Sequence, residues 1–181
     1  MPLTERHECR PRTFYAATKM AQEQFALAAA RADGLRVIAT RSFNHSGPGQ
    51  SGRFLLPALV RRARAAREAP GSPVAIGNTE TVRDFLHVED VVGAYIALVA
   101  KGHAGQVYNV CSGDGVSVGA LAGEVLSQAA VTSPLVPNPS LQRSVDDPYL
   151  VGDNSKLRSD TGWVVTRSRK DIIDDLLNAA T

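Results

Sequence analysis

The sequence is poor in cysteine, in aromatic residues and in net charge. Its two cysteines, Cys9 and Cys111, form no metal-ligand spacing and no disulfide framework, so a reducing, cytoplasmic location is expected. A net charge of +2 gives no broadly basic surface. Positive charge concentrates only in residues 61–67, and most such runs are solvated helix faces. Without interleaved aromatic residues, this pattern is not that of a nucleic-acid-binding protein.

Long apolar runs are also missing. The first residues, Met1 to His7, contain no apolar signal-peptide core, and no later stretch is long and apolar enough to span a membrane. A soluble protein with no membrane partner is therefore expected. The hydrophobic content of 44% is nevertheless ordinary for a globular domain, so the chain can bury a sizeable core.

The stretch from Tyr15 to Lys19 opens a run of helix formers that continues to Ala30. A spacing of four places Tyr15 and Lys19 on one helical face, where an ammonium can lie close to a phenol. A neighbouring cation lowers the pKa of a phenol from its ordinary value of about 10, which suits a general acid/base. The motif is short, and a buried tyrosine beside a surface lysine explains the same five residues.

Strands and helices alternate along the chain. Strands are expected at 35–41, 74–77 and 106–111, and helices at 15–33, 54–68, 91–100, 118–130 and 170–180. The turn-rich segment 42–50 follows a strand, which is where α/β folds bind ligands. Four prolines make residues 132–148 an expected irregular excursion, and Trp163 is expected in the core. This alternation predicts a layered α/β fold.

Five blocks in a fixed order carry a resemblance to a known family. They are Tyr15-x-x-x-Lys19, RSFNHSGPGQ at 41–50, Gly77-Asn78 with RDF at 83–85, YNVCSG at 108–113 and TGW at 161–163. In this order they resemble the extended short-chain dehydrogenase/reductase family, or NAD-dependent epimerase/dehydratase family, over nearly all of the chain. Full-length members open with a Rossmann half that carries a glycine-rich cofactor turn and a catalytic Ser or Thr. No such turn follows an opening strand here.

The resemblance therefore implies the C-terminal part of a Rossmann-type extended fold, with the N-terminal glycine-rich half absent. Residues 1–50 would end the cofactor domain and include the Tyr-x-x-x-Lys helix. Residues 51–181 would form mainly the smaller nucleotide-sugar-binding domain, with returning strands and helices. The missing half would come from a partner polypeptide, or the chain would form a homo-oligomer. By itself the chain is expected to be inactive.

The resemblance also implies a catalytic end of the site. Tyr15 would donate a proton to the C4 oxygen of a keto sugar while NADP or NAD carries the hydride. Lys19 would bind the nicotinamide ribose and lower the pKa of Tyr15. His45 matches a histidine that contacts the cofactor, and a loop histidine bonded to the backbone is an equal alternative.

Four residues match the nucleotide-sugar end of the site: Asn44, Arg83, Arg143 and Asp146. Asn44 and the two arginines would meet the diphosphate, whose charge and geometry suit guanidinium groups, and Asp146 would hold a hydroxyl. The alternatives are a turn asparagine at position 44, a local salt bridge for Arg83 and a solvated loop position for Arg143.

The function that the resemblance implies is reduction of the C4 keto group of a GDP-4-keto-6-deoxy sugar. Gly49-Gln50 favours a reductase, because dehydratase members carry arginines after the Asn-His loop. A GDP-mannose 4,6-dehydratase or a sugar-nucleotide epimerase is the first alternative. A non-catalytic nucleotide-sugar-binding fragment is the second.

Overall fold

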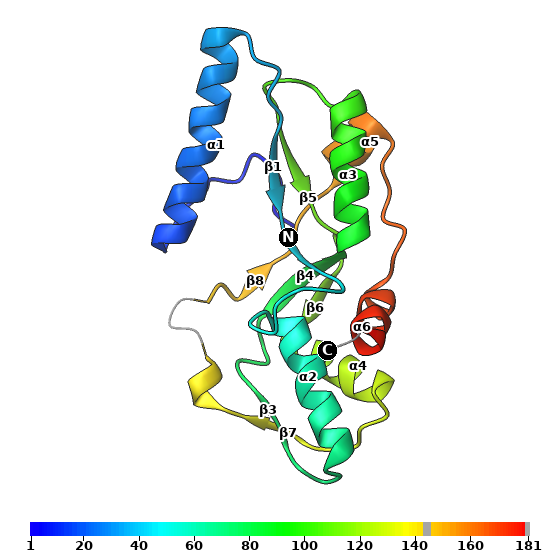
Figure 1. The fold of residues 1–181 in the computed structure, drawn as a ribbon. Helices are drawn as coiled ribbons and strands as arrows, with labels where there is room; N and C mark the ends of the chain where they lie inside the picture. The colour runs from blue at the N-terminus through cyan, green and yellow to red at the C-terminus, as the bar shows by residue number, and fades with distance from the viewer. Residues whose placement is uncertain (143–145, 180–181) are drawn as a thin grey trace.

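Two parallel strand pairs lie at opposite ends of an elongated molecule (Figure 1). The computed structural model describes residues 1–142 and 146–179. At one end, β1 (Ala39–Ser42) pairs with β5 (Val107–Val110), and Ala39 lies opposite Val107. At the other end, β3 (Val74–Ile76) pairs with β7 (Leu135–Pro137). Strands alternate with helices, which confirms the predicted α/β class.

A third sheet joins the two ends, and β4 (Val82–His87) is its central strand. Around β4 lie β2 (Asn44–Ser46), β6 (Gly115–Ser117) and β8 (Tyr149–Leu150). The strands β2 and β8 are parallel to β4, whereas β6 is antiparallel. Because this mixed sheet occupies the middle of the molecule, loops from both ends converge on β4 (Figure 1).

The helices of the described residues are α1 (Phe14–Asp33), α2 (Leu55–Glu68), α3 (Val88–Lys101), α4 (Val118–Gln128), α5 (Ser155–Thr161) and α6 (Arg169–Asn178), with a short 3-10 turn, η1 (Pro139–Leu141). The predicted helix at 15–33 is confirmed. The Thr13 hydroxyl accepts from the backbone N–H of Ala16 at its start, and Gly34 ends it at a φ of +67°. No described helix has the length and apolar character needed to cross a membrane.

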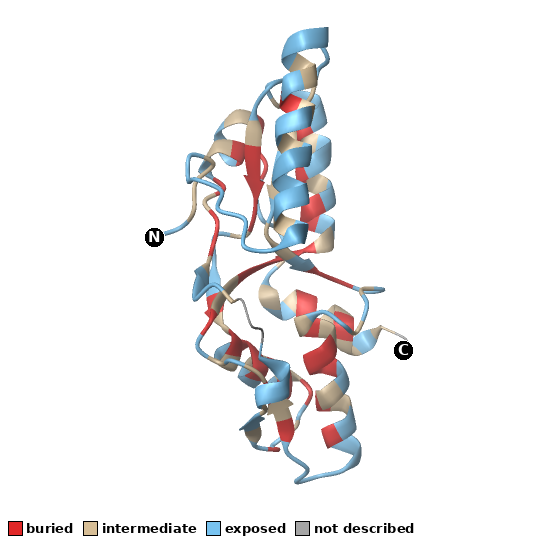
Figure 2. Ribbon diagram, turned by 90° about the vertical axis from the view of Figure 1, so that its left-hand side faces the viewer, coloured by how far each residue is buried: buried red, intermediate tan, exposed pale blue. Residues whose placement is uncertain are grey.

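The core consists of two apolar clusters. One lies between α2, α4 and α6 and includes the fully buried Leu59 and Ile172. The other joins α3, α5 and β5, and it contains Trp163 as predicted. The helix α1 belongs to neither cluster: Leu27 is its only buried residue, and most of α1 carries the exposed colour in Figure 2.

A buried carboxylate holds the middle of the molecule together. Asp84 of β4 has no exposed surface. It accepts hydrogen bonds from the backbone N–H groups of Ser112, Gly113 and Gly152 at 2.8, 2.9 and 3.2 Å, and from the Ser112 hydroxyl at 2.6 Å. These donors compensate the loss of water around the charge. They tie the segments after β5 and β8 to the strand that carries Arg83.

Several elements differ from the sequence prediction. The predicted loop 42–50 contains β2, and the strand expected at 35–41 starts only at Ala39. The predicted irregular excursion 132–148 contains β7 and η1. The strand β2 consists of the polar residues 44–46, and β4 carries Arg83 and Asp84 among its apolar residues, so neither shows a clean alternation of apolar and polar side chains. Both segments are held extended by hydrogen bonds to neighbouring strands.

Candidate functional site

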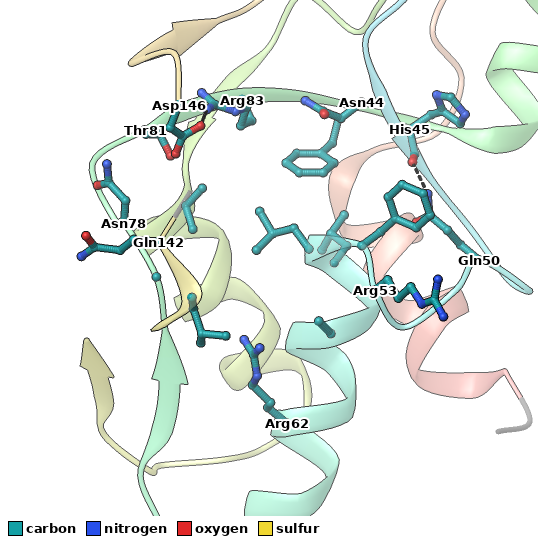
Figure 3. Close-up of a pocket in the computed structure, with 18 residues that line it drawn as sticks. Asn44, His45, Gln50, Arg53, Arg62, Asn78, Thr81, Arg83, Gln142 and Asp146 are labelled. Carbon is teal, nitrogen blue, oxygen red and sulfur yellow. Dashed lines mark hydrogen bonds and ion pairs between the residues drawn. The ribbon is translucent and has the colours of Figure 1, made fainter. Parts of the chain in front are cut away.

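A pocket of about 240 Å³ opens between α2, β4 and η1 (Figure 3). Leu56, Phe85 and Val118 are among the apolar residues that line it. The labelled polar side chains around it are Asn44, His45, Gln50, Arg53, Arg62, Asn78, Thr81, Arg83, Gln142 and Asp146. Three of these are arginines and one is a carboxylate. Among the described residues, the lining is therefore basic and suits an anionic ligand.

The first turn of α2 forms part of the pocket wall. Phe54, the residue before the helix, provides no side-chain cap. Pro57 has no N–H, and the N–H groups of Leu55 and Leu56 bond to no side chain of the described residues. Uncapped N–H groups and the positive end of the helix dipole favour an anion at this position.

The glycines before α2 are a signal that the sequence analysis missed. Gly47, Gly49 and Gly52 have the Gly-x-Gly-x-x-Gly spacing, and they lie between β2 and α2. Gly49 has a φ of +82°, and a Cβ atom at Gly47 would lie 2.5 Å from Cγ1 of Val88. The tight loop brings Gln50 and Arg53 to the pocket, where the Gln50 amide donates to the His45 carbonyl at 2.9 Å.

The structure brings Asn44, Arg83 and Asp146 together at this pocket. Arg83 forms an ion pair with Asp146, and their side chains are 12% and 21% exposed. Its guanidinium also donates to the Val82 carbonyl at 2.8 Å. The Asn44 amide donates to the Asp84 carbonyl at 3.2 Å, which leaves its oxygen toward the pocket side. Arg143, the second predicted arginine, lies outside the described residues.

Tyr15 and Lys19 lie apart from this pocket, on one face of α1. The Tyr15 side chain is 72% exposed, and the Lys19 ammonium lies 5.7 Å from the centre of its ring. That distance is within the range of a cation–π contact. Lys19 also donates to the Gln22 amide oxygen at 3.3 Å. Both functional groups are therefore accessible to a ligand that approaches α1 from outside.

His45 lies at the rim of the pocket. Its Nδ1 is 3.0 Å from the Phe43 carbonyl, and the ring is exposed. A ring nitrogen that bonds a carbonyl carries the hydrogen, so Nε2 is left as an acceptor. The backbone bond of the loop-histidine alternative is present, and contact of His45 with the cofactor stays a prediction.

The basic run at 61–67 is only partly solvated, so the sequence prediction for it was wrong in part. Arg61 and Arg67 are exposed, but Arg62 is half-buried and lines the pocket. Arg64 is also half-buried, and its guanidinium donates to backbone carbonyls at the C-terminal end of α6, at 2.8 to 3.2 Å. This interaction satisfies carbonyl groups that a helix end leaves unpaired.

Comparisons with known proteins agree with the order of the sequence blocks. Residues 1–176 match the family model described as GDP-mannose 4,6 dehydratase. The GDP-6-deoxy-D-mannose reductase of Pseudomonas aeruginosa is 33% identical over 180 residues, which cover 97% of this chain and 59% of the reductase. A dTDP-glucose 4,6-dehydratase of Streptomyces griseus is 31% identical over 160 residues, covering 88% of this chain and 47% of the dehydratase.

Solved structures show the same fold. RMD from Pseudomonas aeruginosa complexed with NADPH superposes with a TM-score of 0.90 at 32% identity, covering 98% of this chain and 59% of that one. DesIV, a dTDP-glucose 4,6-dehydratase from Streptomyces venezuelae with NAD and TYD bound, gives 0.83 at 26% identity, with 99% and 53% covered. The predicted partial Rossmann-type fold is confirmed. The chain spans about half to three-fifths of the length of these relatives.

Proposed function

Because the chain belongs to the GDP-mannose 4,6-dehydratase family of extended short-chain dehydrogenases/reductases, we propose that it forms the nucleotide-sugar-binding part of an NAD(P)-dependent sugar-nucleotide oxidoreductase. The supporting observation is the basic pocket beside the uncapped first turn of α2. The specific reaction that we propose is reduction of the C4 keto group of a GDP-4-keto-6-deoxy sugar. The similarity to a GDP-6-deoxy-D-mannose reductase and the Gly49-Gln50 pair support this choice.

The substrate diphosphate would lie between the first turn of α2 and Arg83. Helix N–H groups and Arg83 present positive charge toward this part of the pocket, Arg53 lies close to the start of α2, and Asn44 offers an amide oxygen. Asp146 holds the Arg83 guanidinium in place and can accept a hydrogen bond from a sugar or ribose hydroxyl. In this arrangement the sugar points out of the pocket, toward the catalytic helix α1.

Tyr15 would donate its phenolic proton to the C4 oxygen of the sugar. The nearby Lys19 ammonium can donate to a ribose hydroxyl of a nicotinamide cofactor. The exposed Tyr15, Lys19 and Nε2 of His45 therefore fit the nicotinamide end of NADPH or NADH, which supplies the hydride when bound. Both cysteines are free, in keeping with a reducing compartment such as the cytoplasm.

The boundary between cofactor and substrate regions is proposed near residue 50. Residues 1–50 contain α1 and β1, and 51–181 contain α2 and most of the pocket. A nucleotide-sugar-binding fragment without catalysis is the second candidate function. It is favoured by one observation: the residues that line the basic pocket do not include Tyr15 or Lys19.

Replacement of Tyr15 by phenylalanine tests the proposed chemistry. In the chain combined with an amino-terminal Rossmann half from a relative, Tyr15→Phe should lower the rate of 4-keto-sugar reduction by at least about 100-fold, the usual contribution of a general acid. GDP-sugar affinity should persist, because only a hydroxyl is removed. Tyr149→Phe, which removes an exposed hydroxyl outside the pocket, is the control. Unchanged turnover in Tyr15→Phe would exclude Tyr15 from the mechanism.

A further inference from the structure

Arg62 occupies the end of the pocket that lies away from the Arg83–Asp146 pair (Figure 3). It follows Leu55 by seven residues, which on an α-helix is about 10 Å along the axis. Leu55, Ala58 and Arg62 all line the pocket, so one face of α2 runs from the uncapped first turn to this guanidinium. A nucleotide whose phosphates lie at the first turn would place its base near Arg62.

The Arg62 guanidinium is half-buried without a carboxylate partner among the described residues. Its one hydrogen bond there is from Nη1 to the Ala75 carbonyl, at 3.1 Å. Burial, and in second place the charge of Arg61, lowers its pKa. Arg83 differs, because Asp146 neutralises it. Arg62 therefore keeps N–H donors for a ligand and bears a desolvation cost that a ligand acceptor would offset.

Amide side chains line the wall of the same pocket. The Asn78 oxygen accepts from the Glu80 N–H at 3.0 Å, so its NH₂ group remains as a donor. Gln142 lies beside it in Figure 3. A Cβ atom at Gly77 would lie 2.8 Å from the Leu141 carbonyl, so η1 packs directly on the end of β3 and closes this wall. Arginine and amide groups in a partly apolar pocket suit the edge of a nucleobase.

We infer that Arg62 selects guanine as the base of the bound nucleotide, by donating two parallel hydrogen bonds to O6 and N7 of the purine. This inference rests on the proposed nucleotide-sugar site. A guanidinium fork matches two adjacent acceptors, which guanine presents on that edge. Adenine places an amino donor beside N7, and uracil presents a single carbonyl acceptor there. The diphosphate does not compete for Arg62, because Arg83 and the first turn of α2 lie away from it in the pocket.

Calorimetric titrations of the 181-residue chain with GDP, ADP and UDP test this inference. The unmodified chain should bind GDP more tightly than ADP or UDP, by roughly 5- to 150-fold, the discrimination of one bidentate arginine–base contact. Arg62→Ala should lose that preference, with GDP affinity falling toward that for ADP and UDP. Arg62→Lys retains the charge and a donor for the Ala75 carbonyl but has no fork, so it should also lose the preference. Arg67→Ala, exposed on the same helix, should change nothing.

Thermal unfolding followed by circular dichroism identifies variants that fail to fold. If Arg62→Ala does not fold, Arg62→Lys still tests the inference. An equal loss of affinity for all three nucleotides in the Arg62 variants would overturn the inference, because the residue would then bind the shared diphosphate or shape the pocket. Preserved selectivity in both variants would overturn it as well. If the folded, unmodified chain binds none of the three, the proposed nucleotide site itself is wrong, and the inference fails with it.

Discussion

Arg83 and Asp146 neutralise each other inside a pocket where both side chains are largely buried. Family resemblance predicted each as a separate substrate-binding residue, and their mutual ion pair was not predicted. The positions are 63 residues apart in the chain, and the pairing of β4 with β8 helps to bring their segments together. A diphosphate at this site would share the guanidinium with a carboxylate, which weakens the attraction that Arg83 alone would provide.

A double-mutant cycle separates these two contributions to substrate binding. Arg83→Ala should weaken the affinity for a GDP-sugar by roughly 1.5 to 3 kcal/mol, as expected for loss of a hydrogen bond to a charged group. Arg83→Ala with Asp146→Ala should recover part of this loss, because the unpaired carboxylate that repels the diphosphate is also removed. Calorimetry gives both values. Equal affinity in the unmodified chain and Arg83→Ala would mean that the ion pair has only a structural role.

Spacing along one helix predicted the Tyr15–Lys19 pair, because residues four apart share a helical face whatever surrounds them. The same rule could not identify Arg62. Four arginines lie within seven residues of α2, and their side chains point in different directions around the helix. Which of them faces the pocket depends on where β3 and η1 lie in the fold. A half-buried and an exposed arginine look alike in such a run.

At the scale of elements, α3 presents two different apolar faces. Val91, Ala94 and Leu98 pack in the core. The stripe of Val92, Tyr95, Ile96 and Val99 is exposed, with Ile96 at 66% and Val99 at 85%. Helical spacing explains the stripe, but exposed apolar surface of this extent is unusual unless another surface covers it. We propose that a Rossmann-type half covers α3, and that copies of the 181-residue chain associate through this stripe when that half is absent.

Charged substitutions on the stripe should reduce self-association. Ile96→Glu with Val99→Glu should shift the 181-residue chain toward the monomer in sedimentation velocity, because two carboxylates would have to be desolvated in the contact. The thermal unfolding midpoint should change little, since both side chains are exposed. Ala65→Glu, an exposed position on α2, is the matched control and should leave association unchanged. Association that is identical in the double variant would assign it to another surface.

Other elements show which helices and strands can be predicted from sequence patterns alone. Long helices with clear ends, such as α1 between Thr13 and Gly34, were predicted within a residue or two. The strand β4 was missed because Arg83 and Asp84 interrupt its apolar residues, and Asp84 is acceptable there only because four distant donors satisfy it. Such compensation depends on loops far away in the sequence. It cannot be read from local periodicity.

At the scale of the whole molecule, the two ends of the proposed site differ in completeness. The nucleotide-sugar end has a pocket with walls from α2, β4 and η1. The cofactor end has the exposed Tyr15 and Lys19 on α1, with His45 at the pocket rim. The glycine spacing at 47–52 leads into α2 at the pocket and not to the Tyr15 helix. The 181 residues should therefore bind a GDP-sugar better than they bind NADPH, because the first turn of α1 is capped by Thr13 and follows no glycine-rich turn.

The most direct test of this difference between the nucleotide-sugar end and the cofactor end is an NADPH fluorescence titration. The purified 181-residue chain is titrated alone and with the amino-terminal Rossmann half of a relative. The chain alone should give weak binding or none, and no reduction of a 4-keto sugar nucleotide. The mixture should give saturable binding that Lys19→Ala weakens. Tight, saturable NADPH binding with turnover by the chain alone would contradict an incomplete cofactor end.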